Sequence, residues 1–190
     1  EPKTVLFVSH DIDEDVKMAD LIAVMRDGAL VQIAPPAELL ANPADAFVAD
    51  FVGADRALKG LALTRLEDID LRPAPVVEVG AEREAIERRI AAGDLVPVDG
   101  ALLAVDARGR PLRWVALESV GSRLDATPGR LEPVLPAVAT LRDALAALFE
   151  TGAGYDIVVD RFRRPIGLVG VDAIAGGLST PAEQAAGADG

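Results

Sequence analysis

The chain has no cysteine and only one histidine among its 190 residues. These absences exclude a disulfide framework, thiolate zinc sites and zinc sites built from several histidines, so we expect no metal site. No uncharged run approaches the roughly 18 residues that a membrane-spanning helix needs, and no cleavable signal is recognisable at the amino end. Basic residues number 19 against 31 acidic ones, and the net charge of −12 argues against a nucleic-acid partner and against attraction to an anionic membrane.

One stretch of the sequence occurs twice, at residues 105–120 and 159–174. Each copy has a β-branched strand end, an acidic residue, a short basic turn with proline, a second apolar strand and an acidic residue that opens a helix. The matched pairs share an offset of 54 positions: Asp106 and Asp160, Pro111 and Pro165, Glu118 and Asp172. We therefore predict a duplication of a small α/β unit, whose copies pack together because neither is large enough to bury a core alone.

The predicted domain boundaries follow from this repeat. Residues 61–122 are expected to form the first copy and residues 123–178 the second, with a disordered tail over 179–190, which has nothing to bury. Residues 54–60 are predicted to be a hinge. Thr64-Arg-Leu-Glu67 fits a capping box, which predicts a short helix at the entry to the duplicated part.

Residues 1–60 are expected to form a different unit. Thr4–Val8 is a continuous apolar, β-rich run, as in a strand buried in a parallel sheet. Asp27-Gly28 between two apolar runs indicates a hairpin. Residues 36–40 and 47–52 have the pattern of two short helices.

Several motifs of this part lie in a fixed order: Val8-Ser-His-Asp-Ile-Asp-Glu14, Ala19-Asp-Leu-Ile-Ala-Val-Met-Arg-Asp-Gly28 and Phe47-Val-Ala-Asp-Phe-Val-Gly53. Together they resemble the carboxyl-terminal end of an ABC-transporter ATP-binding subunit. The subgroup that imports glycine betaine, carnitine, choline or proline is the most similar, because there a tandem pair of CBS domains follows the ATPase domain, and the repeat looks like that pair. The resemblance runs from about Lys3 to Ile174. It implies an α/β (α+β) fold: a carboxyl-terminal remnant of a P-loop ATPase domain followed by a tandem CBS (Bateman) module.

The resemblance gives His10 the role of the family's switch histidine at a strand end, which reaches the γ-phosphate of ATP and helps to hold the attacking water. A neutral imidazole can donate to a phosphate oxygen and orient a nucleophile. On spacing alone, a single histidine after an apolar run is more typical of a structural role. The sequence has no Gly-x-x-x-x-Gly-Lys-Ser/Thr loop, no signature motif and no apolar strand ending in Asp-Glu. ATP and magnesium are therefore expected as cofactors of the intact subunit, and this chain alone is expected to be an inactive fragment.

Clefts between paired CBS units bind adenine nucleotides or cyclic dinucleotides in many members. The resemblance places Asp172 at the carboxylate that holds the ribose hydroxyls, with Glu118 as its counterpart, and Tyr155 where it could stack on a base. The alternative for both carboxylates is a helix-start position favoured by the helix dipole, and for Tyr155 it is packing. The hydroxyl that normally lies two residues before the carboxylate is replaced by Gly170 and Ala116, which puts phosphate binding in doubt.

The basic turns 108–110 and 161–164 are typical of solvated surface. The alternative is contact with an acidic partner or an anionic messenger.

The leading hypothesis is an ATP-binding subunit of an osmoprotectant ABC importer, which couples ATP hydrolysis to uptake of a quaternary amine such as glycine betaine. A regulatory CBS pair would respond to ionic strength, a nucleotide or a cyclic dinucleotide. The implied partners are a second ATPase subunit in a homodimer and a membrane-spanning permease, with no nucleic acid and no membrane span of its own. This implies a cytoplasmic location, peripheral on the inner face of the cell membrane. The alternative is a stand-alone CBS ligand-sensing module.

Overall fold

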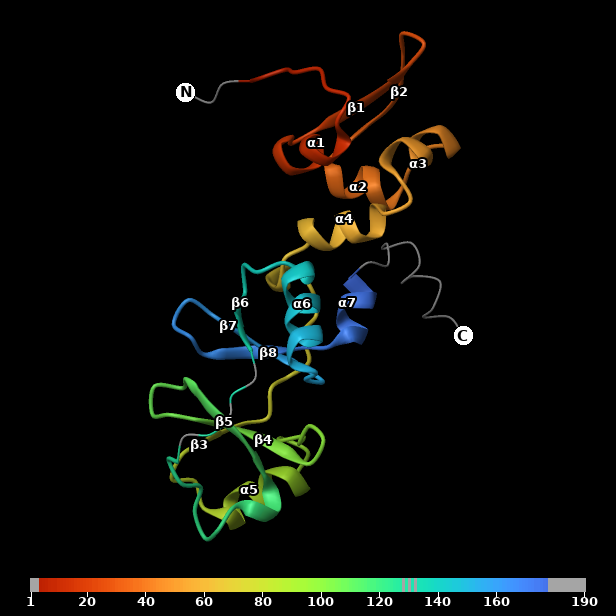
Figure 1. The fold of residues 1–190 in the computed structure, drawn as a ribbon. Helices are drawn as coiled ribbons and strands as arrows, with labels where there is room; N and C mark the ends of the chain where they lie inside the picture. The colour runs from red at the N-terminus through yellow and green to blue at the C-terminus, as the bar shows by residue number, and fades with distance from the viewer. Residues whose placement is uncertain (1–3, 128, 130, 132, 178–190) are drawn as a thin grey trace. The chain divides into compact units, whose positions relative to one another are not determined.

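The computed structural model describes residues 4–127, 129, 131 and 133–177 (Figure 1). The chain divides into two units, one made of the described residues up to Thr64 together with Gly176 and Gly177, and one spanning Arg65–Ala175. Within the described residues, no helix combines the length and the apolar character needed to cross a membrane.

The first unit is built on a hairpin. Strands β1 (Ile22–Arg26) and β2 (Ala29–Ala34) pair antiparallel, and the two residues between them, Asp27 and Gly28, have φ angles of 53° and 78°. Two positive φ angles match the right-handed twist of the flanking strands, so the Asp-Gly hairpin lies where the sequence predicts it.

Four short helices accompany this hairpin: α1 (Ile12–Met18), α2 (Pro36–Ala41), α3 (Ala46–Val52) and α4 (Arg56–Leu63). The first unit has one apolar core, to which the hairpin and helices α1 to α3 contribute: Val16, Ile22, Val24, Ala34, Leu39, Leu40, Val48 and Val52.

The predicted strand at residues 4–8 is wrong. Val5, Leu6 and Val8 are 77%, 91% and 89% exposed, and no described backbone pairs with this segment. A strand of a parallel sheet is stable only between neighbouring strands, and the described residues supply none for it.

The predicted hinge and the helix after it are also wrong. Residues 56–63 form α4, in which Lys59 Nζ lies 2.7 Å from the Asp13 carboxylate and 3.0 Å from that of Asp55. Lys59 also donates to the Val52 carbonyl at 2.9 Å, and these contacts hold the helix in place. Thr64 ends α4 instead of capping a following helix, and only a 3-10 turn follows, at Leu66–Asp68.

The second unit contains two three-stranded sheets of the same topology. In the first sheet, β3 (Val76–Glu78) pairs in parallel with β4 (Ala101–Val105), which pairs antiparallel with β5 (Pro111–Ala116). Helix α5 (Arg83–Ala91) connects β3 to β4, because parallel neighbours need a long crossover connection. A 3-10 turn at Leu117–Ser119 follows β5.

The second sheet repeats this order. Strand β6 (Val134–Pro136) pairs in parallel with β7 (Asp156–Val159), which pairs antiparallel with β8 (Pro165–Val169). Helix α6 (Leu141–Thr151) connects β6 to β7, and α7 (Val171–Gly177) follows β8 (Figure 1).

The turns of the two copies share the same hydrogen bonds. In each, one oxygen of the aspartate accepts two backbone N–H groups at 2.8 and 2.9 Å, and a β-bulge precedes the aspartate. The donors are Arg108 and Arg110 for Asp106, and Phe162 and Arg164 for Asp160. The duplicated stretch therefore adopts one conformation twice, from the strand end to the second strand.

Each copy begins with an arm that pairs with the other copy. Leu66 N–H donates to the Ala139 carbonyl and Leu124 N–H donates to the Ala81 carbonyl, both at 2.9 Å. Leu124 lies 58 positions after Leu66, and Ala139 lies 58 positions after Ala81, so each copy pairs its first residues with the other copy in the same way. Leu66 and Leu124 are buried, and each thus completes the core of the opposite copy.

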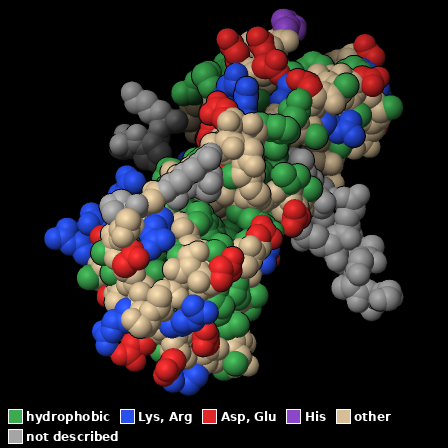
Figure 2. Space-filling view, turned by 60° about the horizontal axis from the view of Figure 1, so that its bottom comes forward, with side chains coloured by type: hydrophobic (Ala, Val, Ile, Leu, Met, Phe, Trp, Pro, Cys, Tyr) green, Lys and Arg blue, Asp and Glu red, His purple; other side chains and the backbone are tan. Residues whose placement is uncertain are grey.

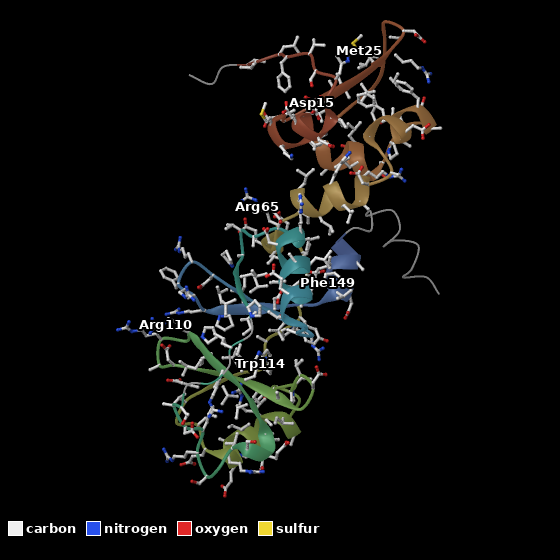
Figure 3. All side chains as sticks on the ribbon, viewed as in Figure 1. Asp15, Met25, Arg65, Arg110, Trp114 and Phe149 are labelled. Atoms are coloured by element: carbon white, nitrogen blue, oxygen red, sulfur yellow. The ribbon has the colours of Figure 1, made fainter. Side chains whose placement is uncertain are left out.

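A shared apolar cluster joins the two sheets. Trp114 lies between them (Figure 3) and packs, half-buried, against this cluster, whose buried members are Val98, Leu103, Ile157, Val159 and Leu168. The segment between the 3-10 turn Leu66–Asp68 and β3 enters the same region. There Arg72 pairs with Leu168 through two backbone hydrogen bonds of 3.0 and 2.8 Å. A Cβ on Gly167 would lie 2.5 Å from the Leu71 Cβ, so this close approach requires glycine.

Candidate functional site

The structure fixes the backbone around His10 and leaves its side chain exposed. Asp11 N–H donates to Ser9 Oγ at 2.9 Å, and the Asp11 carboxylate accepts from the N–H groups of Asp13 and Glu14 at 3.0 and 3.3 Å. This carboxylate is the N-cap of α1. The geometry can present an imidazole from a rigid turn at the start of a helix.

Asp172 is exposed in the first turn of α7. The turn is closed by Ile174 N–H, which donates to the Gly170 carbonyl at 3.1 Å. A carboxylate at this place is favoured by the free N–H groups of the helix start, and it remains available to a ligand.

Tyr155 lies directly beside Gly170, the residue two positions before Asp172. A Cβ on Gly170 would come within 2.9 Å of two carbons of the Tyr155 ring and 3.3 Å of the Gly154 carbonyl. The ring therefore fills the space into which a serine or threonine side chain would project. The structure thus brings Tyr155 next to the segment that carries Asp172, and gives a steric reason for the glycine.

Arg72 is a residue of this site that sequence reasoning missed. Its Nη1 donates to the Tyr155 hydroxyl at 2.6 Å, and its guanidinium carbon lies 5.1 Å from the centre of the ring. The two residues are 83 positions apart, and no local motif links them. Tyr155 is half-buried, so Arg72 and Gly170 together hold its ring in one place.

Glu118 differs from Asp172 in its surroundings. It is exposed in the 3-10 turn Leu117–Ser119, which ends at Val120. The chain then turns away, because Ser122 and Leu124 pair with the first sheet's helix entry. The two carboxylates are thus equivalent in sequence, but only one lies at the start of an α-helix.

The rest of the described surface offers few groups that could bind a ligand. No group of three or more metal-ligating side chains occurs among the residues that the structure describes. A shallow hollow of about 360 Å³ is lined by Glu82, Arg83, Glu84, Ser122 and Arg123, with both signs of charge. In the first basic turn, the backbone N–H of Arg110 holds the pKa of Asp106 below its ordinary value, against the opposing effect of desolvation.

The chain is similar to curated ATP-binding proteins of transport systems. No protein-family model matches the chain. The osmoprotectant import ATP-binding protein OsmV of Salmonella typhimurium is 39% identical over 185 residues, which cover 94% of this chain and 47% of that protein. The carnitine transport ATP-binding protein OpuCA of Listeria monocytogenes is 32% identical over 179 residues, which cover 88% and 43%. Both relatives are named as ATP-binding proteins of transport systems, and the chain is similar to them over most of its own length.

The chain spans about half the length of the curated relatives that it matches. Among solved structures, Staphylococcus aureus OpuCA aligns with 58% of this chain and 94% of its own, at a TM-score of 0.45 and 16% identity. The resemblance of the sequence to ATP-binding subunits of ABC transporters is confirmed by these relatives. The mixed α/β fold class, with its duplicated second unit, is confirmed as well.

Proposed function

We propose that this chain is the carboxyl-terminal part of an ATP-binding subunit that energises uptake of an osmoprotectant such as a quaternary amine. The observation that carries the proposal is the alignment with OsmV, which extends over 94% of the chain and therefore includes both units. The proposed partners are a second copy of the subunit and a membrane-spanning permease, which would hold the protein at the inner face of the cell membrane. A stand-alone sensor is not favoured, because relatives named as transport ATP-binding proteins align with both units.

His10 is the proposed catalytic residue of the intact subunit, where it would reach the γ-phosphate of ATP. Its exposed side chain and its hydrogen-bonded turn support this role, since a rigid donor loses little entropy on meeting a phosphate. ATP and magnesium would bind to the part of the subunit that carries the phosphate loop. The 190-residue chain alone is expected to show no phosphate release above background.

The test is uptake of labelled glycine betaine by cells in which the intact subunit carries His10→Ala. Loss of one positioned catalytic group lowers turnover by about 10²-fold or more, so both uptake and ATP hydrolysis should fall together. Asp20→Asn, an exposed change in the same unit, should leave both unchanged. Uptake at the parental rate with His10→Ala would contradict the proposed role, and uptake that does not require the subunit would contradict the proposed function.

For the duplicated unit we propose a regulatory nucleotide cleft formed by Asp172, Glu118 and Tyr155. The exposed carboxylates suit ribose hydroxyls, and the Tyr155 ring offers an aromatic face. Calorimetric titration of the chain with ATP, AMP and cyclic di-AMP tests this cleft. Asp172→Asn should weaken the binding by about tenfold, the loss of one charge-assisted hydrogen bond, and the exposed Asp70→Asn should not. Absence of heat for all three nucleotides would contradict the cleft and favour regulation by ionic strength.

A further inference from the structure

The basic turns of the two copies meet at one edge of the second unit (Figure 1). Arg164 Nε donates to the Arg108 carbonyl at 3.1 Å, and the Arg164 side chain covers Gly109, where a Cβ would lie 3.5 Å from its Cγ. These contacts join two segments that lie 56 positions apart. The turns therefore form one continuous surface, which we call the paired turns (residues 106–110 and 160–164).

The paired turns are basic in a strongly acidic chain. They contain five arginines and two aspartates, a net charge of +3, whereas the whole chain has −12. Figure 2 shows basic side chains gathered at the left of the second unit, and Figure 3 shows Arg110 there. Like charges held together cost free energy unless an anion lies among them.

Three of these arginines are available to a ligand. Arg110 is engaged by the Asp106 carboxylate at 2.8 Å, and Arg164 by the Arg108 carbonyl. For Arg108, Arg161 and Arg163, within the part of the chain that the structure describes, no carboxylate lies within ion-pair distance of the guanidinium, and all three are exposed. A planar guanidinium matches phosphate oxygens in a two-pronged geometry that lysine lacks.

The backbone gives an independent reason to look for a function here. Gly109 and Arg163 occupy the same place in the two turns, with φ angles of 78° and 63°. Glycine adopts this left-handed conformation without a steric penalty, whereas arginine is destabilised in it. The second copy thus keeps a strained arginine where the first copy has glycine, and such strain persists at sites where the side chain is used.

Phe162 positions one of the three free arginines. Its ring is 60% exposed, and the guanidinium carbons of Arg161 and Arg164 lie 4.8 and 5.8 Å from its centre. Contact with a ring face restricts the guanidinium, so less entropy is lost when Arg161 meets an anion.

We propose that the paired turns bind a phosphate-bearing anion through Arg108, Arg161 and Arg163. The site uses none of the residues of the proposed nucleotide cleft, and it requires no ATPase half. A soluble pyrophosphate group and the phosphate of a lipid headgroup offer the same chemistry, so the experiment includes both sources.

The test uses the 190-residue chain and two probes: calorimetric titration with pyrophosphate, and flotation with phosphatidylcholine vesicles that contain or lack phosphatidylglycerol. The double variant Arg108→Gln/Arg161→Gln should bind about 10²-fold more weakly, since each lost charge-assisted contact is worth about tenfold. Its matched control is Arg88→Gln/Arg89→Gln, which removes the same charge from the exposed side of α5 and should change affinity less than twofold. Binding should weaken with rising salt.

Arg163→Gly separates a binding role from a structural one. It should bind about tenfold more weakly and yet unfold at a higher temperature, because the strain is removed together with the guanidinium. Binding to pyrophosphate alone indicates a soluble ligand, binding to phosphatidylglycerol vesicles alone indicates a lipid, and either supports the proposal. It is overturned if the parent chain binds neither probe, if the α5 control loses as much affinity as the turn variant, or if Arg163→Gly binds as tightly as the parent.

Discussion

Introducing a hydroxyl-bearing side chain at residue 170 provides a sharp test of the packing around Tyr155. Gly170→Ser would place a Cβ 2.9 Å from two ring carbons of Tyr155, well inside ordinary contact distance. The backbone at Gly170 lies outside the left-handed region, so the penalty is steric. Overpacking of this kind costs about 1–3 kcal/mol, which corresponds to a fall in Tm of about 4 °C or more per kcal/mol for a unit of this size.

The assay is urea unfolding followed by the fluorescence of Trp114, the only tryptophan of the chain, which lies in the same unit. The control is Gly121→Ser, where a Cβ would meet nothing within 4 Å. In a Tyr155→Ala background the ring is gone, and Gly170→Ser should then cost much less, because only the Gly154 carbonyl, 3.3 Å from the Cβ, still lies close. The double-mutant cycle should therefore give a coupling energy of about 1–3 kcal/mol. An equal cost of Gly170→Ser with and without the ring would refute the reasoning.

Three further changes test other contacts. Thr140→Ala removes the capping box of α6 and should lower the free energy of unfolding by about 1 kcal/mol, whereas Thr140→Ser should restore it; equal stability of both variants in urea would contradict the cap. The backbone N–H of Thr140 lowers the pKa of Asp143. This carboxylate therefore stabilises the fold above its unfolded pKa of about 3.9, and the gain is lost as pH falls through the lower folded pKa. Asp143→Asn should flatten the plot of stability against pH below about pH 4, and an unchanged slope would count against this. The Asp13 carboxylate raises the pKa of Lys59. The stabilisation that Lys59 gives the fold is therefore complete below its unfolded pKa of about 10.4 and is lost as pH rises through the higher folded pKa. Lys59→Met should lower helical circular dichroism at neutral pH, and a spectrum equal to that of Lys17→Met would argue against a role in holding α4.

Features that depend on neighbours in the sequence could be predicted. Asp27 and Gly28 determine a tight turn by their own conformational preferences. A capping box is a less decisive local signal: one forms at Thr140 and Asp143, whereas the one expected at Thr64 does not form, because Thr64 ends α4 and its hydroxyl donates to the Gly60 carbonyl. The repeat could be read as two copies of one conformation because the turn aspartates bond backbone N–H groups only two and four positions away.

Features that depend on distant residues could not be predicted in this way. The apolar run at residues 4–8 has the composition of a strand, but pairing partners decide whether a strand forms. Helix α4 replaces the expected hinge because Lys59 reaches Asp13, 46 positions earlier. The same limit applies to the candidate site: the offset of 54 made Glu118 and Asp172 equivalent, and only the structure separates a 3-10 turn from an α-helix.

The reciprocal arms have a consequence for how the second unit folds. The bond between Leu66 and Ala139 closes a loop of 73 positions, and the one between Leu124 and Ala81 closes a loop of 43. Such long loops raise the contact order and slow folding, because chain entropy is lost before the contacts form. Since each arm supplies a buried leucine to the opposite copy, we expect the two copies to unfold in a single transition, and a chain synthesised from its amino end to complete the first copy only after the start of the second has emerged.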